Sequence, residues 1–262
     1  MNNFVYRITL SLGCLASLGL AQLAPPNPAG VAMGHIHLNT KDPDAQRKLW
    51  VDLLGAQQTT LGKYEVYKMP GVLIMFNKVD STAGTKGSVV DHIGVRVKDL
   101  AAVMTKIEAA HITVVSRSAT QAMLLAPDDI RLELTEDATM PQPLANHHIH
   151  FYANDVDAMK KWYVDTFGAI PGKRGKFEAA DLPGVNLSFT PSTATLAPTK
   201  GRAVDHIGFE IHDLQVFTKK LEANGVKFEI PYREIPALKI ALAFISDPWG
   251  TRIELTEGLD KL

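Results

Sequence analysis

The chain has 262 residues, enough for one large hydrophobic core or two ordinary ones, because single domains usually have about 100–150 residues. Apolar residues make up 46% of the chain and charged residues 21%, which is the composition of a soluble globular protein. The net charge is −1, and the lysines and arginines are scattered rather than clustered. Nothing in the charge pattern therefore indicates a nucleic-acid or polyanion partner.

Residues 1–21 have the pattern of a secretory signal peptide. One basic residue, Arg7, precedes the 13 uncharged residues Ile8–Leu20, and Gly19 and Ala21 are small residues at the positions that signal peptidase reads. A membrane anchor is the weaker alternative, because a bilayer-spanning helix needs about 20 residues. We expect cleavage after Ala21 and a secreted protein, periplasmic in a Gram-negative host, with no membrane segment after cleavage. The single cysteine, Cys14, would leave with the signal, so the mature chain has no thiol chemistry.

Residues 22–32 contain three prolines and are predicted to be a flexible lead-in. After them the chain is a tandem duplication. Asp42–Ala56 aligns with Asp155–Ala169 at the offset that relates the two first histidine strands. In both stretches apolar residues recur at three- and four-residue spacing, which predicts helices that an aspartate opens and Gly55 or Gly168 ends.

The two repeats span residues 33–137 and 146–258, joined by a linker at 138–145. A shallower repeat lies inside each of them, because each strand histidine is followed seven residues later by an aspartate that opens a helical pattern. The histidine–aspartate pairs are His35–Asp42, His92–Asp99, His148–Asp155 and His206–Asp213. The order strand, helix, strands therefore occurs four times, and the sequence predicts an α+β fold.

Each repeat carries two histidine strands and a later strand with a central glutamate, Glu133 or Glu254. Residues two apart on a strand share a face, so His35 lies on the face of His37, and His148 on the face of His150. A concave sheet face with two imidazoles and one carboxylate suits a divalent metal and leaves one side open for water and substrate.

Asp91 and Asp205 precede the middle histidines, His92 and His206, and are expected to point to the opposite face. We do not assign these two aspartates as ligands. A lone histidine on a strand is more often a hydrogen-bonded structural residue than a ligand. The recurrence of both histidines and the glutamate at matching places in the two repeats favours metal binding in at least one of them.

These residues resemble the vicinal oxygen chelate superfamily, which contains glyoxalase I, type I extradiol dioxygenases, methylmalonyl-CoA epimerase, and bleomycin and fosfomycin resistance proteins. The resemblance covers nearly the whole chain after the lead-in. The segments that carry it are His35–Asp42 with Leu49–Ala56, Asp91–Val95, and Asp247–Leu255, which reads Asp-Pro-Trp-Gly-Thr-Arg-Ile-Glu-Leu. The first repeat departs from the last segment, because Ala126–Asp129 stands in place of the Asp-Pro-Trp-Gly element.

The resemblance implies paired βαβββ units that form cup-shaped mixed half-barrels, each cup around one metal. We expect each repeat to form one cup. The family's ligands are a first-strand histidine, a fifth-strand histidine and a final-strand glutamate. They fall on His35, His92 and Glu133 in the first repeat, and on His148, His206 and Glu254 in the second. The implied cofactor is a divalent metal: iron, manganese, nickel or zinc.

The resemblance also implies a small-molecule substrate that chelates the metal through two adjacent oxygens. Our first hypothesis is proton transfer of the lyase or isomerase type, which needs a base beside the metal. His37 and His150 are the candidates, and Glu210 and Glu178 are weaker ones. Neither Val72–Phe76 nor Val185–Phe189 supplies the additional glutamate of glyoxalase I, and an exported protein lacks a glutathione pool.

Two alternatives remain open. An extradiol-type ring-cleaving dioxygenase is supported by the two-repeat length and by Asp247–Glu254. However, Phe244 stands where that family has tyrosine, and Val226–Ile245 contains no histidine. A non-catalytic small-molecule binder, of the resistance-protein type, ranks last because both ligand sets are intact. The oligomeric state is left open, with a homodimer as one alternative.

Overall fold

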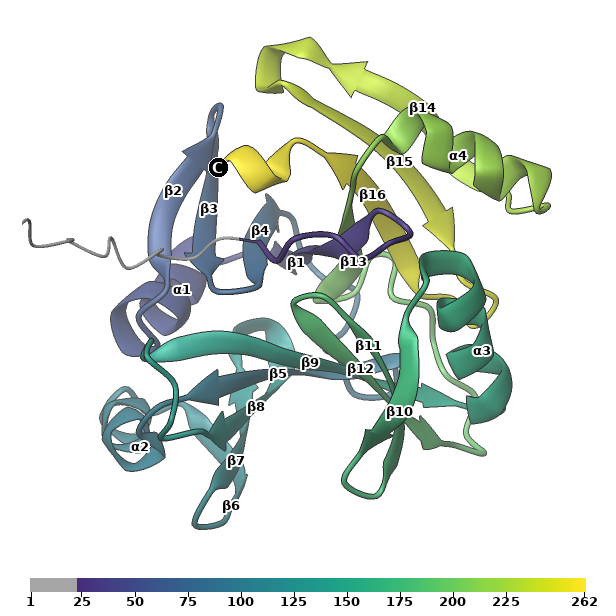
Figure 1. The fold of residues 1–262 in the computed structure, drawn as a ribbon. Helices are drawn as coiled ribbons and strands as arrows, with labels where there is room; N and C mark the ends of the chain where they lie inside the picture. Colours follow the sequence, from purple (N-terminus) through teal and green to yellow (C-terminus); the bar gives the residue numbers. More distant parts are fainter. Residues whose placement is uncertain (1–22) are drawn as a thin grey trace, which may run out of the picture.

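The computed structural model describes residues 23–262, which form two eight-stranded sheets with helices beside them (Figure 1). The predicted signal peptide, residues 1–21, lies outside the described residues, so its cleavage stays a prediction. From Leu23 onward, no helix is both long enough and apolar enough to cross a membrane.

Four consecutive units each contain a strand, a helix and three further strands, as the sequence repeat predicts. The first comprises β1 (Val31–Thr40), α1 (Pro43–Arg47), η1 (Lys48–Leu53), β2 (Gln57–Leu61), β3 (Tyr64–Met69) and β4 (Val72–Lys78). The second comprises β5 (Val90–Val97), α2 (Leu100–Ala109), β6 (Thr113–Arg117), β7 (Gln121–Ala126), η2 (Pro127–Asp129) and β8 (Ile130–Glu136). The third comprises β9 (Leu144–Ala153), α3 (Val156–Phe167), β10 (Ile170–Arg174), β11 (Phe177–Leu182) and β12 (Val185–Pro191). The fourth comprises β13 (Val204–Ile211), α4 (Leu214–Ala223), β14 (Phe228–Ile235), η3 (Pro236–Leu238), β15 (Ile240–Ser246), β16 (Arg252–Glu257) and a closing turn, η4 (Leu259–Lys261).

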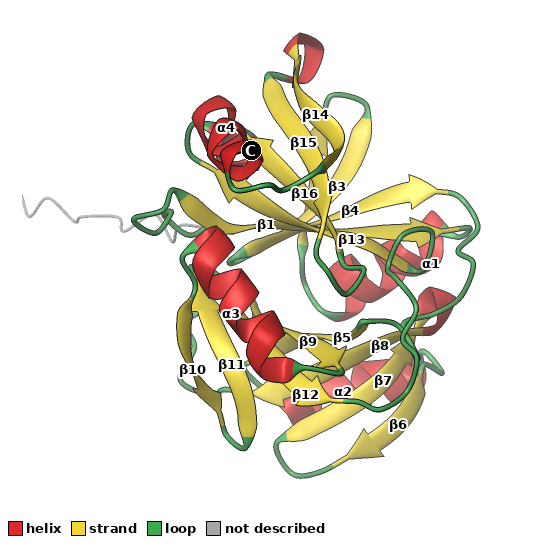
Figure 2. Ribbon diagram, turned by 90° about the vertical axis from the view of Figure 1, so that its right-hand side faces the viewer, coloured by secondary structure: helices red, strands yellow, loops and turns green. Residues whose placement is uncertain are grey.

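Each sheet combines one unit from each sequence repeat. Sheet I joins the first and fourth units in the order β14-β15-β16-β13-β1-β4-β3-β2, and sheet II joins the third and second in the order β10-β11-β12-β9-β5-β8-β7-β6. At the centre of each sheet two histidine strands pair antiparallel, β1 with β13 and β9 with β5 (Figure 2). The α+β class with half-barrel sheets is confirmed. The expectation that each repeat forms one cup by itself is wrong.

The lengths of the segments between units account for this pairing. Residues 137–143, between β8 and β9, are fewest and connect two units within sheet II. The longer segments 79–89 and 192–203 cross between the sheets and run side by side, where the Val89 amide donates to the Ala197 carbonyl at 3.0 Å. A short connection keeps consecutive units adjacent, whereas the longer ones let the chain change sheets.

An aspartate carboxylate opens each of the four α-helices by accepting a hydrogen bond from the backbone amide three residues later, as predicted. The capping residues are Asp42, Asp99, Asp155 and Asp213. Helix α3 ends at Gly168 in the left-handed conformation, with φ of 68°, which glycine adopts without strain. The first helix differs from expectation, because after Arg47 it widens into the π-helical η1.

One hydrophobic core lies between the two sheets. Residues next to the strand histidines face this core from both sheets, among them Ile36 and Ile207 of sheet I and Ile149 of sheet II. Because neighbouring residues of a strand point to opposite faces, the histidines point away from the core, into the concave side of each sheet. We call these concave sides cup I and cup II.

Residues 23–30, part of the predicted lead-in, pack against the rest of the fold instead of extending from it. Leu23 is buried in a small apolar cluster with Leu61 and Leu259. The Asn27 side-chain amide donates to the Phe167 carbonyl at 2.9 Å, at the end of α3. The segment differs from the flexible prediction because its leucine and asparagine both find partners in the folded units.

The aromatic contact of α3 with sheet I gives a test of the core between the sheets. Phe167 is fully buried, and its ring centroid lies 4.7 Å from that of Phe209 in β13. Phe167→Ala removes this contact and leaves a cavity, so we expect the free energy of unfolding to fall by about 3–5 kcal/mol. Val216→Ala on the exposed side of α4 should change it by less than about 0.5 kcal/mol. Denaturant titration measures both, and equal small effects would contradict the packing described.

Candidate metal sites

Two glycines determine where the first-strand histidines lie. In sheet I, His35 of β1 is opposite Gly208 of β13, and in sheet II, His148 of β9 is opposite Gly94 of β5. A Cβ atom added at Gly208 would lie 2.0 Å from Cε1 of His35, and one added at Gly94 would lie 2.0 Å from Cε1 of His148. Each imidazole therefore occupies the space that a side chain on the partner strand would fill.

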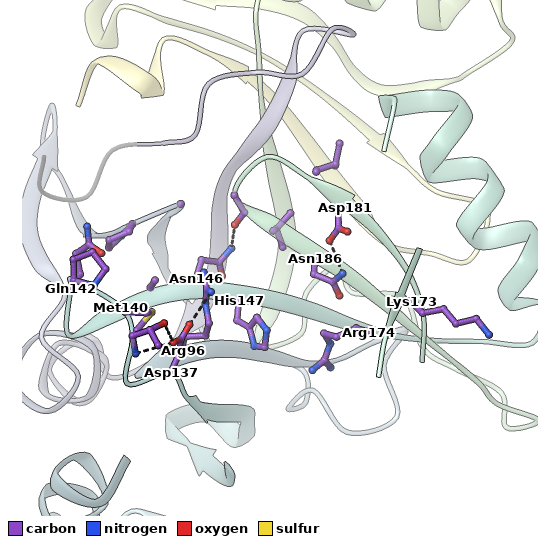
Figure 3. Close-up of a pocket in the computed structure, with 18 residues that line it drawn as sticks. Arg96, Asp137, Met140, Gln142, Asn146, His147, Lys173, Arg174, Asp181 and Asn186 are labelled. Atoms are coloured by element: carbon purple, nitrogen blue, oxygen red, sulfur yellow. Dashed lines mark hydrogen bonds and ion pairs between the residues drawn. The ribbon is translucent and has the colours of Figure 1, made fainter. Parts of the chain in front are cut away.

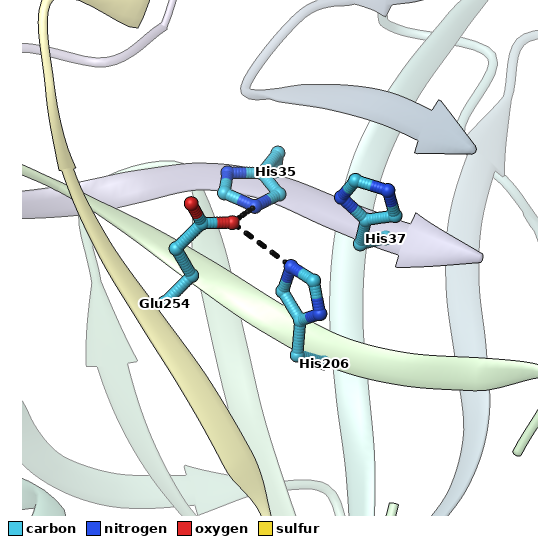
Figure 4. A group of neighbouring side chains, drawn as sticks. All are labelled: His35, His37, His206 and Glu254. Carbon is cyan, nitrogen blue, oxygen red and sulfur yellow. Dashed lines mark hydrogen bonds and ion pairs between the residues drawn. The ribbon is translucent and has the colours of Figure 1, made fainter. Parts of the chain in front are cut away.

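Cluster I lies in cup I and contains His35, His37, His206 and Glu254, from β1, β13 and β16 (Figure 4). Nε2 of His35 and Nε2 of His206 each lie 2.9 Å from the same carboxylate oxygen, Oε2 of Glu254. One ligand atom from each of the four side chains lies within 4.8 Å of the others. His35, His206 and Glu254 are all buried, so the cluster is shielded from bulk water.

Cluster II repeats this arrangement in cup II with His92, His148 and His150. Nε2 of His92 lies 3.2 Å from Nε2 of His148. Glu133 of β8 is nearby, with its carboxylate oxygens 3.6 Å from His92 and 3.9 Å from His148. The second cluster is therefore looser than the first, but the same residue types converge from the same strand positions.

The grouping of ligands differs from the one expected from the sequence. The expected trios were His35, His92 and Glu133 within one repeat, and His148, His206 and Glu254 within the other. The structure exchanges the first-strand histidines, so His35 joins His206 and Glu254, and His148 joins His92 and Glu133. The cause is the sheet pairing described above, because each central pair of strands comes from different repeats.

The aspartates before the middle histidines contact the same histidines, contrary to expectation. Nδ1 of His206 donates to Oδ1 of Asp205 at 2.6 Å, and Nδ1 of His92 donates to Oδ1 of Asp91 at 2.7 Å. Asp205 also accepts from Nη1 of Arg252 at 2.8 Å. Such a carboxylate fixes the tautomer of the ring and directs Nε2 toward a ligand.

Burial alone would raise the pKa of Glu254 and Asp205, but hydrogen bonds outweigh it. Bonds from His206 and His35 hold the pKa of Glu254 well below its usual value, and those from His206 and the Gly201 amide do the same for Asp205. Burial lowers the pKa of His206, but Asp205 and Glu254 together raise it above its ordinary value. Both carboxylates are therefore ionised at neutral pH.

The donor set of cluster I fits a divalent cation. Because Nδ1 of His206 carries a proton for Asp205, the 2.9 Å contact of its Nε2 with Glu254 requires either a second proton on the ring or a cation between the two groups. A cation would replace that second proton and leave the Nε2 lone pair of a neutral ring to act as a ligand. Two imidazoles and one carboxylate are the ligands that iron, manganese, nickel and zinc accept in proteins.

His37 and His150 are the members of the two clusters that the sequence did not predict as ligands, and both are neutral. Both ring nitrogens of His37 are buried and lack hydrogen-bond partners among residues 23–262, and burial with the charge of His206 lowers its pKa to about 3. His150 stacks on His92 with ring centroids 4.5 Å apart and shares a 2.8 Å hydrogen bond with Oγ1 of Thr190. Burial and His92 lower the pKa of His150 to about 3.

The weaker base candidates lie elsewhere. Oε1 of Glu210 accepts a hydrogen bond from the Gly258 amide at 2.6 Å, and its Oε2 accepts one from the Thr256 hydroxyl at 2.9 Å. Burial raises the pKa of Glu210 to about 7, and its bonds tie it to the segment after β16 rather than to cluster I. Glu178 forms ion pairs with Lys160 and Lys173 at the surface.

Residues 145–255 match the family model of the Glyoxalase/Bleomycin resistance protein/Dioxygenase superfamily. This range covers the third and fourth units, from β9 into β16. The chain therefore contains a domain of that superfamily, which confirms the resemblance found in the sequence.

Individual relatives agree with this family. Glyoxylase I 4 from Arabidopsis thaliana is 29% identical over 134 residues, which are 47% of this chain and 76% of the relative. Glyoxalase I from Zea mays has a TM-score of 0.66 at 18% identity, covering 88% of this chain and 94% of that one. A putative dioxygenase from Bacillus subtilis has a TM-score of 0.67 at 16% identity, covering 90% of this chain and 86% of that one. At such identities the two solved structures show a shared fold alone.

The contact between glycine and imidazole gives a test of the exchanged ligand sets. Gly208→Ala places a Cβ against the His35 ring, so we expect the imidazole NMR signals of His35 to shift and those of His148 to stay unchanged. Gly94→Ala should do the reverse, and serves as the matched control. If Gly208→Ala moved the His148 signals instead, the pairing of β1 with β13 would be wrong.

Proposed function

We propose that this protein is a divalent-metal-dependent enzyme that transfers a proton on a small substrate bound through two adjacent oxygens. One observation carries the proposal. In each sheet, two imidazoles and a glutamate converge in the cup, and the middle imidazole is oriented by the aspartate before it. A purely structural histidine would not need the same supported arrangement twice.

The chain's own residues would divide the work in cup I. His35, His206 and Glu254 would hold the metal, which supplies Lewis acidity and two positions for substrate oxygens. Asp205 would keep Nε2 of His206 directed at the ion. His37, whose ring nitrogens have no partner within the described chain and which lies beside the ligand atoms, would accept and return the proton.

Proton transfer of the lyase or isomerase type is favoured over other reactions by the relative named Glyoxylase I 4. A glyoxalase I reaction on a glutathione adduct is not proposed. Met75 of β4 pairs with His37, and Ser188 of β12 pairs with His150, so neither β4 nor β12 places a carboxylate opposite these histidines. The substrate is therefore proposed only as a class, a carbonyl or hydroxycarbonyl compound with two neighbouring oxygens.

Replacing the glutamate in cluster I tests its part in metal binding. Glu254→Gln should weaken nickel or zinc binding by at least about ten-fold, because it removes the only carboxylate of the cluster. Glu257→Gln is the matched control. That residue is on the same strand, but its carboxylate accepts from the Leu214 amide at the start of α4. Calorimetric metal titration measures both variants, and equal effects would remove Glu254 from the ligand set.

The reaction type is tested with the same protein. Proton transfer predicts exchange of solvent deuterium into the carbon next to the carbonyl of an accepted substrate, and loss of this exchange in His206→Ala. Oxygen consumption with catechols that disappears in His206→Ala would instead support a dioxygenase. A protein that takes up no iron, manganese, nickel or zinc would support neither enzyme and leave a small-molecule binder.

We also propose that the protein is exported, on the pattern of residues 1–21 alone. If so, the protein recovered from its native host should begin at Gln22, as determined by N-terminal sequencing. A chain that still begins at Met1 would contradict export through signal cleavage.

A further inference from the structure

The two cups have different linings although they are built from equivalent strands. In cup I, Leu61 and Leu73 belong to a small apolar cluster, which Leu259 of η4 joins. Leu238 and Leu262 pack against this cluster. The chain's own apolar side chains, including those of residues 259–262, therefore fill part of cup I.

Cup II carries polar and cationic side chains at the same places. Arg174 pairs with Phe177 across its hairpin as Leu61 pairs with Tyr64, so Arg174 takes the place of Leu61. Asn186 pairs with His148 as Leu73 pairs with His35, so Asn186 takes the place of Leu73. Arg96 pairs with Ala145 as Glu210 pairs with Ala32, so Arg96 takes the place of Glu210. The sign of the charge at this last position is therefore reversed between the cups.

Arg174 is held in place at the edge of cluster II. Its Nε donates to the Ser188 hydroxyl at 2.7 Å, and one terminal nitrogen lies 3.9 Å from Glu133. That distance is longer than a hydrogen bond, so the guanidinium has donors to spare. With Glu133 engaged by a metal, Arg174 would be the cation next to the substrate.

Arg96 lies on β5 four residues beyond His92. One terminal nitrogen of Arg96 lies 3.3 Å from Asp137, but its Nε is buried and has no hydrogen-bond partner in the described part of the chain. Buried donors are normally satisfied, so the unpaired Nε leaves Arg96 with a donor for a ligand. His147 lines the same pocket as both arginines.

A pocket of about 790 Å³ connects these residues (Figure 3). Arg96, His147, Arg174 and Asn186 line it, and Figure 3 shows their side chains along β5, β9 and the neighbouring strands. Asp137 and Asp181 also line it, but Asp137 faces Arg96 and Asp181 accepts from the Asn186 amide at 2.7 Å. Lys173 lines the pocket too, but it is paired with Glu178 at 3.1 Å. Arg96 and Arg174 each keep donors without a partner in the described residues.

From this arrangement we propose that cup II binds an anionic substrate, whose carboxylate or phosphate group is held by Arg96 and Arg174 beside cluster II. Arginine guanidinium groups bind both oxyanions through paired N–H donors, which explains why two of them converge on one pocket. This inference rests on the proposed function in one respect: the anion is called a substrate because its metal-chelating oxygens would lie at cluster II. The anion pocket itself depends only on the arginines.

Calorimetry on the full chain, freed of metal, tests the pocket with inorganic phosphate and with succinate as probes. We expect at least one probe to bind, with affinity about ten-fold weaker in Arg96→Gln and in Arg174→Gln. Arg174→Lys keeps the charge and should lose less. Arg117→Gln, an exposed arginine of β6 paired with Glu108, is the matched control and should bind as the unchanged protein does. Tighter binding of succinate indicates a carboxylate substrate, and tighter binding of phosphate a phosphorylated one.

Failure to bind either probe would overturn the inference, as would equal binding by the unchanged protein and both glutamine variants. A metal titration of the same preparations separates this failure from failure of the proposed function. Metal that binds and responds to Glu133→Gln, without anion binding, overturns the inference alone. Anion binding that responds to the arginines, without metal uptake, overturns the enzyme proposal and leaves the pocket as an anion site.

Discussion

The contact of an imidazole ring with a glycine on the neighbouring strand is the constraint on which both candidate sites depend. His35 covers Gly208 and His148 covers Gly94, at distances that exclude any side chain at either glycine. The pairing shifts by one residue just before each of these histidines, at Gly34 in β1. Beyond it the register is unbroken, with His35 opposite Gly208 and His37 opposite His206. The first-strand histidine and the middle histidine therefore lie on the same concave face, where the glutamate of the next strand reaches them.

A network of charged and hydrogen-bonded side chains contacts the middle histidine of each cluster. In cup I it runs from Arg252 through Asp205 to His206 and then to Glu254. Each of these groups would be costly to bury alone, but every neighbour in the chain has the opposite charge or the complementary hydrogen-bonding role. Cup II has the same order with Arg131, Asp91 and His92. Because the network recurs with the strands, it belongs to the architecture of the sites rather than to a chance surface pairing.

Much of this architecture could be predicted from the sequence. The seven-residue interval from histidine to aspartate gave the strand and helix starts, and Asp155 and Gly168 mark the two ends of α3. The alternation of strand residues gave the face on which His206 lies. The alternation could not predict which strand pairs with β13, because β13 has the same pattern whether its neighbour is β1 or β9.

Two further features could not be predicted from the periodicity of the sequence. Strand alternation predicts that Asp205 and His206 point to opposite faces of the sheet. The two side chains meet nevertheless, because they are adjacent in the chain and a carboxylate can reach Nδ1 of the next ring. The short segment 137–143 was the available signal for the sheet pairing, since it leaves little chain for a crossing between sheets. Reading the segment lengths together with the repeats would have placed the second and third units in one sheet.

Duplication explains why the two cups can differ while their clusters agree. The fold requires the histidines, the glycines and the alternation that buries Ile36 and its equivalents, so these recur in both sheets. The outer strands of each cup bury alternate residues in the core between the sheets, such as Val72 and Ile74 of β4. Their concave-facing positions lie outside that core, and there the residues are free to change, from Leu61 to Arg174 and from Leu73 to Asn186. Apolar residues in cup I attract the chain's own residues 259–262, because burying them removes apolar surface from water. Arginines in cup II cannot be covered in this way without an anion, so the same strand positions that close one cup keep the other suited to a charged ligand.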